Sequence, residues 1–239
     1  MSSERPYPES VILLPVHRPS VHLDELITGL LTDGADAGRI VVVDDGSGPQ
    51  ARPILSAARS RGCAVLHHPA NRGKGIALKT GFRYAQQHHP GLNVISADAD
   101  GQHSPADIRR VASRAAPGRI VLGVRRFELM PPRSRFGNTV TRSLFRAATG
   151  RSVSDTQTGL RGYPAESLDH LCGIEGERFE YEMNVLLDAA ACGRPIEEVA
   201  IETTYLNGNA ASNFSSVTDS WQVYGPLLRF TLASLPARA

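Results

Sequence analysis

The chain has 239 residues, of which 41% are hydrophobic and 21% are charged. This length suits one domain with a well-formed hydrophobic core and is too short for two ordinary domains. A net charge of +2 argues against a dedicated nucleic-acid binder. The three cysteines lack metal-ligand spacing in the sequence, so we expect reduced thiols in a cytoplasmic protein.

The sequence predicts neither secretion nor a membrane span. No window approaches the ~20 apolar residues that a spanning helix needs, and Met1–Glu9 lacks the apolar core of a signal peptide. Peripheral contact with a membrane surface stays open. The apolar C-terminal stretch 221–235, which includes Arg229, is consistent with a helix docked on the sheet or with one lying in the membrane interface.

Short apolar runs recur through the first half of the chain, with helix-period patterns between them. Continuous, β-branched runs are typical of strands that are buried on both faces. Their alternation with helices predicts an α/β fold with a mostly parallel central sheet flanked by helices. The predicted strands are Val11–Val16, Ile40–Val43, Ala64–Leu66, Val94–Ala97 and Ile120–Val124.

The second half is less regular. Arg125–Pro132 is predicted to be a loop, and a helix is expected to start at Phe136. A strong helical pattern over Phe179–Ala190 ends at Gly193 and precedes a predicted strand, Ile196–Ile201.

No internal repeat, low-complexity tract or linker divides the chain. We therefore predict one domain over residues 1–239, with a nucleotide-binding half at about 11–124 and an acceptor half at about 125–235.

Two pairs of aspartates follow predicted strands, where ligands of open parallel sheets bind. Asp44 and Asp45 suit hydrogen bonds to a ribose or a nucleobase, with an Asx-turn as the alternative. Asp98 and Asp100 lie two residues apart on a turn, so their oxygens can converge on Mg²⁺ or Mn²⁺ shared with phosphate oxygens. The alternative for this second pair is a polar turn that caps the helix starting near Pro105.

Basic residues are expected at the same edge of the sheet. Arg125, Arg133 and Arg135 are expected in one basic loop after the fifth strand and suit bidentate contact with phosphate, with a solvated loop as the alternative. Asn71–Gly75 at a helix start could approach phosphate through backbone N–H groups. The sequence lacks a P-loop and a GxGxxG motif after its first strand, which argues against P-loop and dinucleotide-binding enzymes.

Six segments of the chain, taken together and in order, resemble the family 2 glycosyltransferases of the GT-A fold. The resemblance runs from about residue 11 to residue 224 and is closest to the dolichyl- and polyprenyl-phosphate sugar synthases. One departure is His17-Arg18-Pro19, which stands where relatives often have Tyr-Asn-Glu. The segments are Pro15, Val42–Ser47, Asn71–Ala77, Asp98–Gln102, Asp155–Arg161 and Asn209–Phe214.

The resemblance implies a role for individual residues. Asp100 and Gln102 would hold Mg²⁺ or Mn²⁺ beside the diphosphate. The catalytic residues would be Asp155, near the transferred sugar, and the phosphate-neutralising Arg125, Arg133 and Arg135. The residues that would bind the nucleotide sugar are Pro15, Val16, Asp44, Asp45, Lys74, Asp98, Ala99 and Arg161.

The implied reaction is inverting transfer of a sugar from a UDP- or GDP-sugar to a polyprenyl phosphate. A soluble hydroxyl acceptor is the alternative, and it would need a carboxylate base, Asp155 first and Glu180 second. Glu180 and Glu182 can equally be solvated helix charges, and His103 can be phosphate-proximal or simply packed. A nucleotidyltransferase would carry a Gly-rich basic loop after the first strand, and the sequence has no such loop there. A non-catalytic nucleotide-sugar binder would not need the acidic motifs, which are intact in this sequence.

Overall fold

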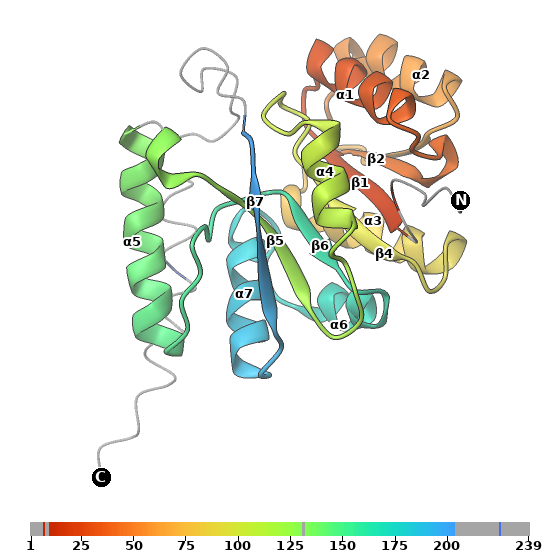
Figure 1. The fold of residues 1–239 in the computed structure, drawn as a ribbon. Coiled ribbons are helices and arrows are strands. Elements are labelled where there is room, and N and C mark those ends of the chain that lie inside the picture. Colours follow the sequence, from red (N-terminus) through yellow and green to blue (C-terminus); the bar gives the residue numbers. More distant parts are fainter. Residues whose placement is uncertain (1–6, 8–9, 131, 204–224, 226–239) are drawn as a thin grey trace, which may run out of the picture.

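The computed structural model describes residues 7, 10–130, 132–203 and 225, and their framework is one mixed sheet (Figure 1). The seven strands of this described part are ordered β3-β2-β1-β4-β6-β5-β7. Neighbours pair in parallel except for β6, which is antiparallel to both β4 and β5. The predicted mostly parallel sheet is thus confirmed. The strands are β1 Ser10–Val16, β2 Ile40–Asp44, β3 Ala64–His67, β4 Asn93–Ser96, β5 Ile120–Arg125, β6 Arg161–Tyr163 and β7 Ile196–Ile201.

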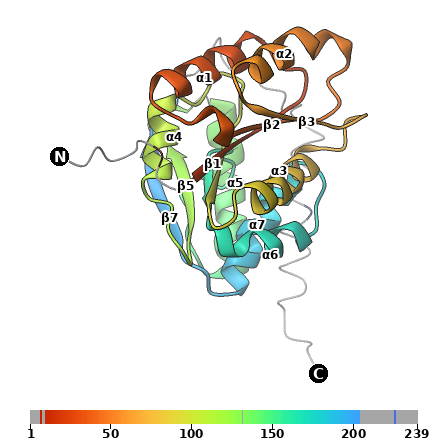
Figure 2. The same cartoon turned by 90° about the vertical axis from the view of Figure 1, so that its right-hand side faces the viewer.

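Helices cover both faces of the sheet. Figure 2 shows α1 and α2 on one side, with α3, α6 and α7 on the other. The α5 helix lies beside α7, beyond the β5–β7 end of the sheet (Figure 1). The helices are α1 Val21–Thr32, α2 Arg52–Ser60, α3 Lys74–His88, α4 Pro105–Ala112, α5 Pro132–Thr149, α6 Leu168–Gly173 and α7 Glu180–Ala191.

The continuous apolar strands build two cores, one on each face of the sheet. Val11 and Leu13 of β1 pack in the core that contains α3, α6 and α7. Ile12 and Leu14 pack in the opposite core, with α1, α2 and α4. Because side chains of a strand alternate between the faces of a sheet, a strand covered on both sides must be apolar throughout.

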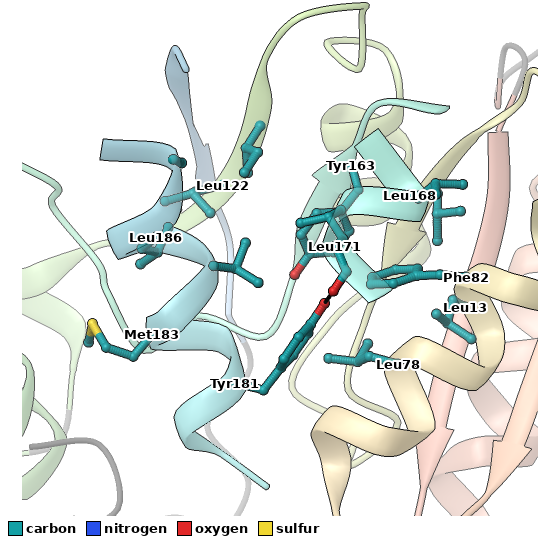
Figure 3. Close-up of a cluster of buried hydrophobic side chains, with 14 of the residues drawn as sticks. Leu13, Leu78, Phe82, Leu122, Tyr163, Leu168, Leu171, Tyr181, Met183 and Leu186 are labelled. Atoms are coloured by element: carbon teal, nitrogen blue, oxygen red, sulfur yellow. Dashed lines mark hydrogen bonds between the residues drawn. The ribbon is translucent and has the colours of Figure 1, made fainter. Parts of the chain in front are cut away.

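A cluster of aromatic side chains fixes the start of α7 against the sheet. Figure 3 shows Tyr181 of α7 next to Tyr163 of β6 and Phe82 of α3. The rings of Phe82 and Tyr163 meet edge to face, with centroids 5.1 Å apart. The Tyr181 hydroxyl donates a hydrogen bond to the Leu171 carbonyl at 2.8 Å. This packing holds α7 rigidly, which matters because its first turn carries a site residue described below.

The prediction of a loop from Arg125 through Arg135 is wrong at its end. The α5 helix begins at Pro132, so Arg133 and Arg135 lie in its first turns and not in a loop. Proline at the first helical position has a backbone angle preset for the helix and needs no N–H partner there. A short 3-10 turn, Phe127–Leu129, precedes the helix.

Two α-helices and one strand were not predicted: α2, α6 and β6. The β6 strand is only three residues long and contains a glycine, so it produces no apolar run. Asn209–Phe214 and, apart from residue 225, the 221–235 stretch lie outside the described residues, and the expectations for them stay predictions. Among the helices that the structure describes, none is long and apolar enough to cross a bilayer.

Candidate active site

The charged residues singled out by the sequence gather at one edge of the sheet. Asp44 ends β2 and Arg125 ends β5, while Asp98 follows closely after β4. Arg161 begins β6, which runs antiparallel, so this residue pairs with Ser96 at the end of β4. This is the edge at which open α/β sheets bind ligands. The structure therefore brings most of the predicted site residues to one place.

Lys74 is the centre of a partly buried ionic cluster. Its Nζ lies 2.7 Å from Asp98 Oδ1 and 2.8 Å from Glu182 Oε2. The lysine starts α3 directly after Gly73, whose φ of 98° favours glycine. Burial alone would lower the pKa of Lys74, but the two carboxylates raise it above its ordinary value. Lys74 is therefore a fixed cation at the end of the sheet.

Asp98 and Asp100 differ in how their charges are balanced. Burial opposes ionisation of Asp98, but Lys74 holds the pKa of this carboxyl below its ordinary value. Asp100 has no ion-pair partner in the described part of the chain, and its Oδ1 accepts the backbone N–H of Gln102 at 3.1 Å. Burial, together with the Asp98 charge, raises the pKa of Asp100 to about 6. The nearby Lys74 lowers this pKa only in part, so Asp100 is poorly compensated compared with Asp98.

The donor set at this edge fits a divalent cation. Three carboxylates, those of Asp98, Asp100 and Glu182, face two cations, Lys74 and Arg161. Glu182 Oε1 lies 3.6 Å from Arg161 Nε and has no hydrogen-bond partner among the described residues. The side chains of Asp100 and Gln102 offer hard oxygen donors, which Mg²⁺ and Mn²⁺ prefer. The residues present are therefore compatible with the predicted metal site.

The turn before β6 closes against this cluster. A Cβ atom on Gly159 would stand 2.1 Å from Asp98 Oδ2 and 3.0 Å from Lys74 Nζ. The Ser96 hydroxyl donates to the Gly159 carbonyl at 3.2 Å and holds the turn in place. Glycine at this position permits a close approach that any side chain would prevent. The predicted segment Asp155–Arg161 thus borders the acidic cluster.

Asp155 and Arg125 form a buried bidentate pair. Arg125 Nε donates to Asp155 Oδ2 at 2.6 Å, and Nη2 donates to Oδ1 at 2.9 Å. The Asp155 side chain is fully buried, and its Oδ1 also accepts the Gln157 N–H at 3.1 Å. Bidentate contacts of this kind fix orientation as well as charge. The two predicted catalytic residues therefore meet, with Asp155 in the position of a group that orients Arg125.

Arg161 is buried and connects two segments of the chain through hydrogen bonds. Its side chain is 1% exposed, and its guanidinium donates to the carbonyls of Thr158, Glu182 and Thr156 at 2.8, 2.7 and 3.2 Å. These bonds join the turn before β6 to the first turn of α7. The nucleotide-sugar contact predicted for Arg161 stays a prediction, and the geometry gives this residue a supporting position behind the site.

Sequence reasoning undervalued Glu182. The alternative that it is a solvated helix charge is wrong, because it is 8% exposed and pairs with Lys74. Its spacing could have indicated this, since it lies three residues after Phe179 and four before Leu186, on the apolar face of the helix. Glu180, in contrast, accepts backbone N–H groups of the preceding turn.

The Asp44–Asp45 corner is held by internal hydrogen bonds. Asp44 is 0% and Asp45 is 3% exposed. Asp44 Oδ1 accepts the Ser47 N–H at 3.0 Å, which is the Asx-turn considered as the alternative. Asp45 accepts the N–H groups of Arg72 and Gly73 at 2.9 and 2.7 Å and thereby anchors the turn before α3. The nucleoside contact stays a prediction for both residues.

The remaining predicted residues border the same edge. Pro15 and Val16 end β1 and lie in register with β2, and Ala99 is half-buried between the two aspartates. His103 is 7% exposed, and its Nδ1 has no hydrogen-bond partner among the described residues. Burial lowers the pKa of His103 to about 4, so this imidazole is neutral at neutral pH.

Arg135 is exposed near the start of α5. Its guanidinium carbon lies 5.3 Å from the centre of the Phe127 ring. The aromatic face attracts the guanidinium and helps to hold it in this exposed position. Arg133 belongs to the first turn of the same helix.

Comparisons with known proteins identify the fold class of this chain and then its family. Glucosyl-3-phosphoglycerate synthase from Mycobacterium tuberculosis, solved with Mn²⁺, uridine-diphosphate and phosphoglyceric acid, is similar with a TM-score of 0.70 at 19% identity. The likeness covers 96% of this chain and 80% of that one. The fold is therefore the GT-A glycosyltransferase fold, as expected. The family model described as Glycosyl transferase family 2 matches residues 11–172, and the chain belongs to that family.

Curated relatives act on lipid phosphates according to their names. Undecaprenyl-phosphate mannosyltransferase of Micrococcus luteus is 30% identical over 74% of this chain and 76% of its own length. Undecaprenyl-phosphate 4-deoxy-4-formamido-L-arabinose transferase of Pseudomonas paraeruginosa is 33% identical over 66% of this chain. This chain spans about half of that second relative, 48% of its length. The resemblance to polyprenyl-phosphate sugar synthases is confirmed.

Proposed function

We propose that this protein is an inverting, metal-dependent glycosyltransferase that moves a sugar from a UDP- or GDP-sugar to a polyprenyl phosphate. We also propose that it works in the cytoplasm, in peripheral contact with the membrane that carries the acceptor. Two undecaprenyl-phosphate sugar transferases among its relatives support this acceptor class. The similar glucosyl-3-phosphoglycerate synthase was solved with uridine-diphosphate and Mn²⁺, which supports the class of donor and the metal.

The Asp155–Arg125 pair is the observation that carries the choice of acceptor. A hydroxyl acceptor must lose a proton to a base, whereas a phosphate acceptor is already anionic. Asp155 was the first candidate base, but Arg125 engages both of its carboxylate oxygens and its side chain is 0% exposed. Asp98 and Glu182 are both paired with Lys74. With these three carboxylates paired to cations and Asp100 assigned to the metal, the site suits an acceptor that needs no base.

Each residue of the edge then has a task. Asp100 and Gln102 would hold Mg²⁺ or Mn²⁺, which when bound would neutralise charge on the leaving diphosphate. Lys74 fixes Asp98 beside that position, and Asp155 orients Arg125. Arg133 and Arg135 add positive charge from α5. Preorganised charge of this kind is commonly the largest single contribution to catalysis.

The test compares two acceptors that differ only in the phosphate. Purified protein with Mn²⁺ and labelled UDP- or GDP-sugars is given a short-chain polyprenyl phosphate or the polyprenol of equal length. We expect transfer to the phosphate alone. Asp155→Asn should retain some of this transfer, because the variant loses the orientation of Arg125 and not a base. Inversion is checked by the anomeric configuration of the product.

Two alternatives would be recognised in the same assay. Transfer to a soluble hydroxyl compound such as phosphoglyceric acid, abolished by Asp155→Asn, with no transfer to any polyprenyl phosphate, would overturn the lipid acceptor. Binding of a nucleotide sugar without transfer and without metal-dependent hydrolysis would indicate a non-catalytic binder.

A further inference from the structure

A second group of metal-ligand side chains lies away from the active-site edge. His170 of α6, Asp188 of α7 and Cys192, which caps α7, offer one nitrogen, one oxygen and one sulfur within 4.8 Å of one another. His170 Nε2 lies 2.8 Å from Asp188 Oδ2, and Cys192 Sγ lies 3.9 Å from Asp188 Oδ1. Asp188 thus stands between the other two side chains. We call these three residues the α7 end cluster.

The helical framework explains why the three side chains converge. Asp188 and Cys192 are four residues apart, so they project from the same side of the last turn of α7. The α6 helix is tied to α7 by the hydrogen bond from the Tyr181 hydroxyl to the Leu171 carbonyl, and Leu171 follows His170 directly. The cluster is therefore built on two helices that the core holds together.

The electrostatics of the position favour a cation. The C-terminal end of an α-helix carries a partial negative charge from its unpaired carbonyl groups, which stabilises positive charge there. Cys192 is the C-cap of α7, and Asp188 adds a carboxylate one turn earlier. The active-site residue Glu182 lies on the first turn of the same helix. It is ten residues before Cys192, which is about 15 Å along the helix axis at ~1.5 Å per residue.

The ligand types distinguish this cluster from the active-site edge. Asp100 and Gln102 offer only oxygen, which suits Mg²⁺ or Mn²⁺. Sulfur and imidazole nitrogen with one carboxylate are the donors that Zn²⁺ prefers, and three protein ligands leave a fourth tetrahedral position for water. Cys192 and His170 are exposed and Asp188 is half-buried, so an ion can reach all three.

We infer that the α7 end cluster is a zinc-binding site, with Cys192 Sγ, His170 Nε2 and Asp188 as ligands and water in the fourth position. Cys192 binds as the thiolate, so each zinc ion that binds displaces the thiol proton to solvent. The bound ion joins α6 to the end of α7 and replaces the present contact between His170 and Asp188. The site is independent of glycosyl transfer, so its failure would leave the proposed function untouched.

Zinc titration by calorimetry tests this inference on the reduced full-length chain, with excess Mg²⁺ present to occupy the oxygen-ligand site. We expect one zinc site with proton release. Cys192→Ser and His170→Gln should each weaken binding by roughly tenfold or more, since even supporting residues of metal sites contribute that much. Both positions are exposed, so circular dichroism should show an unchanged fold. Cys172→Ser, on α6 but outside the cluster, is the matched control and should bind as the wild type does.

Cobalt substitution identifies the sulfur ligand. The wild type and Cys172→Ser should show a thiolate-to-cobalt charge-transfer band that Cys192→Ser lacks. Zinc binding that is unchanged in Cys192→Ser and His170→Gln would overturn the inference, as would the absence of binding in the wild type. Binding that is lost instead in Asp100→Asn would assign the ion to the active-site edge and would also overturn it.

Discussion

The Asp44–Asp45 pair and the Asp98/Asp100 pair share a local sequence pattern but differ in what surrounds them. Each places two carboxylates at or just beyond the end of a strand. Asp44 and Asp45 are satisfied by backbone N–H groups of nearby turns, such as those of Ser47 and Gly73, and by contacts with the imidazoles of His67 and His68. Asp98 instead pairs with Lys74, whereas Asp100 has no ion-pair partner among the described residues, and its pKa is raised to about 6.

The difference in partners separates carboxylates that stabilise the fold from carboxylates that are available for binding. Hydrogen bonds to a carboxylate stabilise its charged form, so a carboxylate that already has such partners needs no bound cation. A carboxylate that is buried beside another acid is costly unless a cation arrives. We therefore expect the Asp44–Asp45 pair to stabilise the fold and the Asp98/Asp100 pair to bind the ligand. The predictions below test that division, in order of the expected loss of turnover.

Asp100→Asn should cause the largest loss of turnover, about 10²–10³-fold, with a melting temperature close to that of the wild type. The substitution removes the charge that would hold the metal and also removes repulsion with Asp98. Turnover and Mn²⁺-dependent nucleotide binding are measured together. Asp169→Asn, an exposed carboxylate on α6, is the control. Nucleotide binding with an unaltered Mn²⁺ dependence in Asp100→Asn would refute the metal assignment.

Lys74→Met should reduce turnover and also destabilise the fold by about 3 kcal/mol, because it leaves Asp98 and Glu182 without their shared cation. Urea denaturation measures the free energy of unfolding. The double variant Lys74→Met with Glu182→Gln should recover part of the stability but not the turnover. A single variant as stable as the wild type would mean that the ionic cluster does not hold this edge together.

Arg133 and Arg135 extend the comparison to the basic side of the site. Changing both to Ala should lower turnover by about tenfold or more while shifting the melting temperature little, since charges at the start of a helix such as that of exposed Arg135 contribute little to stability. Arg83→Ala, another exposed arginine, should affect neither quantity. Equal losses of turnover and stability in the double variant would favour a purely structural role.

The sequence predicted the parts of this molecule in which local pattern and position agree. Apolar runs located five strands of the first half and the strand Ile196–Ile201, and the motifs located the site edge. It did not predict β6, because three residues around Gly162 carry no periodic signal. Nor did it predict that Asp155 forms an ion pair with Arg125, because that pairing depends on a turn of the chain packed against β5.

Asp45→Asn should have the smallest effect on turnover, and its main effect should be on stability. The amide keeps one acceptor oxygen but places an NH₂ group where the N–H of Arg72 or Gly73 now donates, so about 2 kcal/mol should be lost from the free energy of unfolding. The turn before α3 positions Lys74, and a loosened turn should raise the KM for the nucleotide sugar more than it lowers kcat. Denaturant titration and steady-state kinetics on the same preparation separate the two effects. A variant with unchanged stability that no longer binds the donor would reverse the assignment, because Asp45 would then contact the nucleoside directly and the Asp44–Asp45 pair would belong to the site as well.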